Sequence, residues 1–181
     1  MSDDDRVRWD GRYAGREAAA VESVGPPTVF APFEDIFPTT GRALDLACGK
    51  GVGSVWLARR GLEVLGVDVS ATAIEQARDL ARRSEVGDRC RFEVVDLDTG
   101  LPAGPPVDVI LCHLFRDRRL DDAIIARLAP GGLLAVTALS EVGAGPGCFR
   151  AAPGELTAAF TELDVIVAGE GQGVAWLLAR K

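Results

Sequence analysis

Short apolar runs alternate with helix-like segments from residue 42 onward, and this alternation is the strongest constraint on the fold. The first four runs are Arg42–Cys48, Leu62–Val67, Arg91–Val95 and Val107–Cys112. Near-continuous apolar runs of this length are typical of parallel strands that are buried on both faces. Because helix-like segments such as Val52–Arg60 separate them, the pattern predicts an α/β domain.

The last third of the chain continues this pattern and then changes. Leu133–Leu139, after the Pro-Gly-Gly turn at 130–132, predicts a fifth strand, and Glu155–Phe160 predicts a helix. Asp164–Ala168 and Val174–Ala179 flank a glycine-rich turn, which predicts a hairpin. We therefore expect a doubly wound sheet of seven strands, with five parallel strands followed by an antiparallel hairpin at the C-terminus.

The 181 residues favour one domain, in which residues 39–181 follow an N-terminal segment, residues 1–38. Trp9 and Tyr13 lie four residues apart, which places both rings on one face of a short helix. Four prolines between residues 26 and 38 oppose regular structure and indicate a short connector or helix before the main sheet.

The composition excludes several functions. With 20 Lys and Arg against 27 Asp and Glu, the net charge is −7, which repels phosphate backbones and anionic lipid. Four cysteines without a CxxC pair, beside one histidine, argue against a metal site. We expect a cytoplasmic protein with no nucleic-acid or membrane partner, since the polar N-terminus is unlike a signal peptide and no apolar run approaches a membrane span.

A glycine-rich turn follows the first strand. Asp45 lies within that strand, and Gly49, Gly51 and Gly53 lead into the next helix. Glycine lets a backbone approach a ligand closely, and a helix N-terminus adds unpaired N–H groups. A tight turn that binds nothing is the alternative.

Two aspartates at the ends of the next strands favour a nucleoside ligand. Asp68 ends the second strand, where a carboxylate can accept from ribose hydroxyls, and Asp96 ends the third, where it can accept from an adenine amino group. Helix capping or loop solvation is the alternative for both. An NAD(P)-dependent oxidoreductase is disfavoured, because the GxGxxG fingerprint would place its third glycine at Ser54.

These motifs resemble the class I S-adenosylmethionine-dependent methyltransferases. The similarity lies in Ala43–Gly53, Val64–Ser70, Phe92–Leu97 and Leu128–Leu134. It implies a Rossmann-like fold, S-adenosyl-L-methionine as cofactor and S-adenosyl-L-homocysteine as product. Trp9–Tyr13 further resembles the small tellurite-resistance and thiopurine-type methyltransferases, in which an N-terminal segment folds over the cofactor.

The resemblance also implies a role for each matching residue. The methionyl portion is held by Asp45 and the backbone of Ala47, Cys48, Gly49 and Gly51, with Arg12 on its carboxylate. Asp68 holds the ribose and Val69 lies beside the adenine, whose edge Asp96 and Leu97 hold. Cys112 and His113 line the space near the transferring methyl, and Trp9 and Tyr13 complete the cofactor set.

Methyl transfer from a sulfonium is an in-line displacement, which needs a general base only when the acceptor is protonated. His113, the sole histidine, is the candidate base. Because the connection after the fifth strand is short, we expect a small-molecule acceptor, with its acceptor atom open among O, N, S, C and a metalloid. A monomer and a homodimer both remain open, and the alternative function is a non-catalytic S-adenosylmethionine-binding regulatory protein.

Two further segments, an arginine-rich one and a Gly/Pro-rich one, are each expected to have a role at the protein surface. Arg116, Arg118 and Arg119 are expected to solvate the start of a helix over Asp117–Leu128, and the alternative is that His113–Asp117 contributes substrate contacts. The Gly/Pro-rich stretch Val142–Gly154 is expected to form part of a lid, through Pro146, Phe149 and Arg150.

Overall fold

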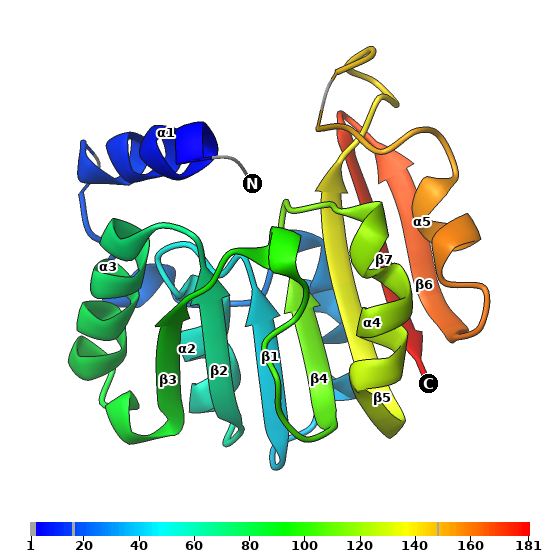
Figure 1. The fold of residues 1–181 in the computed structure, drawn as a ribbon. Helices are drawn as coiled ribbons and strands as arrows, with labels where there is room; N and C mark the ends of the chain where they lie inside the picture. The colour runs from blue at the N-terminus through cyan, green and yellow to red at the C-terminus, as the bar shows by residue number, and fades with distance from the viewer. Residues whose placement is uncertain (1–2, 16, 148) are drawn as a thin grey trace. The chain divides into compact units, whose positions relative to one another are not determined.

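The computed structural model describes residues 3–15, 17–147 and 149–181 (Figure 1). The chain divides into two compact units, Met1–Ala103 and Gly104–Lys181. Cys148, one of the four cysteines, lies outside the described residues. No helix within the described ranges combines the length and the apolar character that a membrane span requires.

The first unit contains three parallel strands, with β2 between β1 and β3. Val64 pairs with Ala43 on one side and with Cys90 on the other. The elements are α1 (Asp3–Ala14), η1 (Val21–Ser23), η2 (Thr28–Ile36), β1 (Arg42–Leu46), α2 (Val52–Arg59), β2 (Glu63–Asp68), α3 (Ala71–Arg83), η3 (Gly87–Arg89), β3 (Cys90–Val94) and η4 (Leu97–Thr99).

The second unit contains four strands. β4 is parallel to β5, β5 is antiparallel to β7, and β7 is antiparallel to β6, which confirms the predicted C-terminal hairpin. The elements are β4 (Val107–Cys112), η5 (Arg118–Leu120), α4 (Asp121–Arg127), β5 (Leu128–Leu139), α5 (Glu155–Ala159), β6 (Asp164–Gly171) and β7 (Val174–Arg180). The described chain is thus an α/β protein with seven strands, as predicted.

The boundaries of two predicted elements are wrong. β5 begins at Leu128, five residues early, because Leu128 already pairs with Val107 before the Pro-Gly-Gly segment interrupts the register. The helix predicted over Asp117–Leu128 is shorter, since a 3-10 turn capped by Asp117 precedes α4. The proline-rich connector is a 3-10 helix, η2, with Pro32 inside it.

Glycines allow α3 to pack closely against the turn after β1. Gly51 has φ +79°, and a Cβ there would lie 2.7 Å from Cβ of Ala77 on α3 and 3.3 Å from the Phe92 ring on β3. Ala77 and Phe92 belong to the buried core that joins α2, α3 and β3. Gly51 is therefore required by packing and by backbone conformation, whether or not a ligand approaches it.

We predict that Gly51→Ala lowers the free energy of unfolding by roughly 2–5 kcal/mol. The left-handed conformation costs about 1–2 kcal/mol with a side chain, and the contact with Ala77 adds about 1–3 kcal/mol. Urea denaturation followed by circular dichroism measures the change. Gly131→Ala is the matched control, because Gly131 also has φ +79° but open space around its Cβ position. Equal losses in the two variants would contradict the packing argument.

Candidate functional site

Asp68, at the end of β2, ties the glycine turn to the central strand of the first unit. Its carboxylate, 6% exposed, accepts from the Gly49 amide through Oδ2 and from the Ser70 amide through Oδ1, both at 2.9 Å. Burial raises its pKa, and the two amides oppose that rise. Because a carboxylate offers about four lone-pair sites, these two amides leave acceptor capacity for a ligand.

Asp45 is turned toward α2. Its carboxylate is 2% exposed and accepts from the Ser54 hydroxyl at 2.6 Å. Burial, together with the nearby negative charge of Asp68, raises the pKa of this carboxyl to about 7. Asp45 therefore joins β1 to α2, the two elements on either side of the glycine turn. Its predicted role toward the methionyl portion stays a prediction.

The turn between β1 and α2 has an unusual backbone. Ala47, Gly49 and Gly51 all have positive φ, at +52°, +53° and +79°. Ala47 accepts this conformation with a side chain, which costs free energy unless the surroundings enforce it. The Cys48 amide donates to the Val67 carbonyl at 2.9 Å and so joins the turn to β2. Burial raises the Cys48 thiol pKa well above its usual value, so this cysteine is an inert thiol.

Helix α1 lies against the N-terminal end of α3 in the first unit (Figure 1). Asp10 accepts from the Ser70 hydroxyl and from the Thr72 amide at 3.3 Å, while Gln76 donates to the Tyr13 carbonyl at 3.2 Å. Ser70 also caps α3 by accepting from the Ala73 amide. Sequence reasoning missed Asp10, because its partners lie about sixty residues away.

The aromatic residues of α1 lie on one face, as predicted. Trp9 and Tyr13 stack with ring centroids 6.0 Å apart, and the Arg12 guanidinium lies 5.0 Å from the Trp9 ring. The Tyr13 hydroxyl is 2.9 Å from the position that a Cβ on Gly49 would take. Tyr13 therefore covers the glycine turn at Gly49, and a side chain at Gly49 would displace its hydroxyl.

The residues after β3 form a short capped turn. Asp96 accepts from the Asp98 amide at 3.0 Å and caps η4, as the capping alternative predicted. Val69 and Leu97 are buried. Capping does not oppose a ligand role, since a carboxylate has several acceptor sites. The adenine roles of these three residues remain predictions.

In the second unit, Cys112 and His113 mark the end of β4. Cys112 is buried, and its thiol donates to the Phe115 carbonyl at 3.2 Å. Nδ1 of His113 lies 2.8 Å from the Thr137 hydroxyl, which also accepts from the Leu114 amide at 2.9 Å. Desolvation lowers the His113 pKa, so the ring is neutral at pH 7. Sequence reasoning missed Thr137, whose hydroxyl lies inside an apolar strand.

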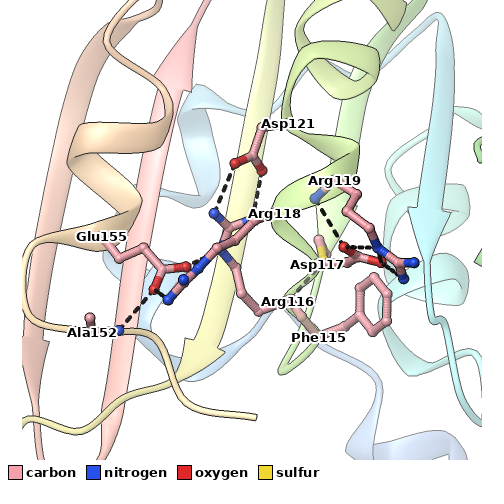
Figure 2. Close-up of polar contacts among 9 residues, drawn as sticks. Phe115, Arg116, Asp117, Arg118, Arg119, Asp121, Ala152 and Glu155 are labelled. Atoms are coloured by element: carbon pink, nitrogen blue, oxygen red, sulfur yellow. Dashed lines mark hydrogen bonds and ion pairs between the residues drawn. The ribbon is translucent and has the colours of Figure 1, made fainter. Parts of the chain in front are cut away.

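The expectation that Arg116 solvates a helix start is wrong. Figure 2 shows its guanidinium between two carboxylates: Asp121 accepts at 2.6 and 2.9 Å, and Glu155 accepts at 2.8 Å. The Arg116 side chain is only 8% exposed. Hydrogen bonding to Arg118, with the charge of Arg116, lowers the Glu155 pKa to about 2. Arg116 therefore joins α4 to α5, whereas Arg118 and Arg119 are exposed, as expected.

The predicted lid segment is partly anchored. Arg150 donates to the carbonyls of Ser140, at 2.6 Å, and Gly173, at 3.4 Å, which joins it to the end of β5 and the β6–β7 turn. Pro146 and Phe149 are exposed. Arg150 is thus a structural brace, and the lid remains a prediction for the other two.

Comparison with known proteins identifies the family. Residues 43–132 match the family model described as "Methyltransferase domain". This chain belongs to that methyltransferase family. S-adenosylmethionine is the cofactor of the family. The matched residues include Asp45, the glycine turn and Asp68, so the site described above lies inside the family domain.

Individual relatives agree with this assignment. The chain is 36% identical over 112 residues to ribosomal RNA small subunit methyltransferase C of Alcanivorax borkumensis, covering 56% of this chain and 33% of that protein. It is 29% identical over 107 residues to a ubiquinone biosynthesis O-methyltransferase of Psychrobacter cryohalolentis, covering 55% and 41%. The fold is similar to that of TehB from Haemophilus influenzae, with a TM-score of 0.72 and 19% identity over 97% of this chain and 66% of that one. The chain spans only about a third of the length of the first relatives it matches.

We predict that Asp45→Asn changes how stability depends on pH. The Asp45 pKa is about 7 in the folded protein and 3.8 in a model carboxyl, so the folded state holds a proton that the unfolded state releases. The wild type therefore loses stability as pH rises from about 4 to 7, by up to about 4 kcal/mol, and the uncharged asparagine does not. Urea denaturation across this pH range measures the difference. Asp88→Asn, at an exposed site, is the control; an Asp45→Asn curve parallel to the wild type would refute the burial argument.

Proposed function

We propose that this protein transfers the methyl group of S-adenosylmethionine to a small-molecule acceptor by in-line displacement. The single observation that supports it most is the buried Asp68 carboxylate, which is bonded to the Gly49 amide and retains acceptor capacity at the end of β2. In an α/β sheet, ligands bind beyond the carboxyl ends of the strands, where acidic residues can accept from ribose hydroxyls. The family assignment supplies the identity of that nucleoside.

We assign the site residues as the family resemblance implies. Asp45 and the backbone of 47–51 hold the methionyl portion, Asp68 the ribose, and Val69, Asp96 and Leu97 the adenine. Residues 1–38 form a cap over the cofactor, with Trp9, Arg12 and Tyr13 contributing to it, on a doubly wound Rossmann-like domain over residues 39–181. The packing of Tyr13 over Gly49 supports the cap. Cys112 and His113 line the acceptor side.

A small acceptor is supported by two properties of the chain. Between β5 and α5 only residues 140–154 intervene, which is too few for a separate substrate domain. The net charge of −7 opposes binding to a phosphate backbone. We therefore propose a cytoplasmic enzyme that acts on a metabolite as a monomer or homodimer, although one relative is named for ribosomal RNA.

We predict that Asp68→Ala weakens the binding of S-adenosylhomocysteine about 5- to 150-fold. The loss of hydrogen bonds to a charged acceptor costs about 1–3 kcal/mol, and 1.4 kcal/mol is tenfold in the dissociation constant. Isothermal titration calorimetry measures the constant. Asp88→Ala is the control for removal of an exposed carboxylate in the same unit. Because alanine also releases the Gly49 amide, Asp68→Asn, which keeps one acceptor oxygen, is measured beside it. Wild-type affinity in both variants would show that Asp68 does not hold the cofactor.

The chemical class of the methyl acceptor is tested by incubating the full chain with methyl-labelled S-adenosylmethionine and a panel of metabolites. We expect label in a small molecule and none in added ribosomal RNA or ribosomal protein. Transfer only to RNA or protein would refute the small-molecule proposal. Tight cofactor binding without transfer to any class would instead favour the alternative, a non-catalytic S-adenosylmethionine-binding regulatory protein.

A further inference from the structure

Hydrogen bonds attach helix α1 to the N-terminal turns of α3 at points that lie one helical turn apart on each helix. At the first point, Oδ1 of Asp10 accepts from the Ser70 hydroxyl and, at 3.3 Å, from the Thr72 amide. At the second point, the Gln76 side chain donates to the Tyr13 carbonyl at 3.2 Å. Residues three or four positions apart share one face of a helix, so both points lie on the facing sides of α1 and α3. Together they fix the rotation of α1 about its own axis.

This orientation places the Tyr13 ring on the glycine turn. The Tyr13 hydroxyl lies 2.9 Å, and the ring carbon Cζ lies 3.6 Å, from the position that a Cβ on Gly49 would take. The amide of the same glycine donates to Asp68, the residue that we assign to the ribose. A ligand that approaches Gly49 from the side of α1 therefore meets Tyr13 first.

Helix α1 depends on α3 for its own stability. It has 12 residues, a length at which an isolated helix is marginal in water. Gly11 lies inside it, and glycine is less favourable than alanine in a helix interior. Among the described residues, no side chain or neighbouring element lies within 4 Å of the position that a Cβ on Gly11 would take. Contacts with α3, rather than the sequence of α1, therefore keep this helix folded.

The connector that follows α1 is held in place without Asp10. The Lys50 ammonium donates to the Glu17 carbonyl, and Arg83 donates to the Ala19 carbonyl at 2.8 Å. Loss of the Asp10 contact would therefore release α1 while the connector stays attached to the first unit.

We propose that Asp10 is the positioning residue that holds α1 over the glycine turn, and that its release from Ser70 and Thr72 opens this turn to the cofactor. The proposal rests on the proposed function, in which α1 is part of the cap, and it adds the contact that controls the cap. Both hydrogen bonds end on Oδ1, so position 10 requires an acceptor oxygen more than a charge. Hydrogen bonding to Ser70 lowers the Asp10 pKa, which agrees with a carboxylate that is bound to α3.

Hydrogen exchange tests the Asp10 contact in the ligand-free full chain, read by mass spectrometry on peptides that cover residues 5–14. Alanine removes the acceptor, whereas asparagine keeps an oxygen that can take the place of Oδ1. We expect exchange in α1 to be about tenfold faster in Asp10→Ala, within about threefold of the wild type in Asp10→Asn, and about fivefold slower in Gly11→Ala.

Exchange in β1 and β2 is expected to stay at the wild-type rate in all three variants, which separates the release of α1 from a loss of global stability. Unprotected α1 amides in the wild type would overturn the proposal. Wild-type exchange of α1 in Asp10→Ala would overturn it as well.

The rates of cofactor binding and release are measured by surface plasmon resonance, with S-adenosylhomocysteine over the immobilised full chain. We expect Asp10→Ala to release this ligand about tenfold faster and to bind it at least as fast, because α1 no longer has to open. Asp10→Asn is expected within about threefold of the wild type, and Gly11→Ala is expected to release the ligand more slowly. Asp88→Ala, which removes an exposed carboxylate from the same unit, is the control.

The two measurements fail in different ways. Wild-type release of S-adenosylhomocysteine from Asp10→Ala, while hydrogen exchange shows α1 released, would overturn the control of the cofactor by Asp10. Absence of binding to the wild type would instead refute the proposed function, and the exchange result on the ligand-free chain would be unaffected.

Discussion

The hydrogen bond from the Gly49 amide to Asp68 is the interaction on which the first unit's site depends. It joins the turn after β1 to the end of β2 and stabilises a backbone in which Ala47 and Gly49 are left-handed. A buried carboxylate is costly unless it is hydrogen-bonded, and a strained turn persists only where its surroundings enforce it. Each feature therefore stabilises the other. Asp45 adds a second buried carboxyl, and the charge of Asp68 raises its pKa.

The sequence was sufficient for features that local patterns determine. The alternation of apolar runs and helices predicted the strands, the spacing of Trp9 and Tyr13 predicted a shared helix face, and the position of Asp96 after an apolar strand allowed for its cap. Asp68 was placed correctly because the carboxyl end of an apolar strand is visible in sequence. Each of these depends on residues within one or two turns of each other, where periodicity and capping preferences act directly.

Features that depend on distant partners could not be predicted. Glu155 lies 39 residues after Arg116, so the burial of that arginine leaves no local signal. Asp10 reaches Ser70 across sixty residues in the same way. The start of β5 was missed because pairing with Val107 overrides the preference of Pro130 for an irregular segment. In each case a tertiary contact decided between two conformations that the local sequence allowed.

In the second unit, the orientation of His113 depends on a single hydroxyl group, that of Thr137. His113 is the one side chain whose ordinary pKa lies near neutrality, and a hydroxyl on a neighbouring strand decides what it can do. Thr137 accepts from the Leu114 amide and lies 2.8 Å from Nδ1 of His113, so a residue of β5 holds both the bend after β4 and the imidazole ring. The local sequence around His113 contains no sign of this contact, because Thr137 lies 24 residues further along the chain.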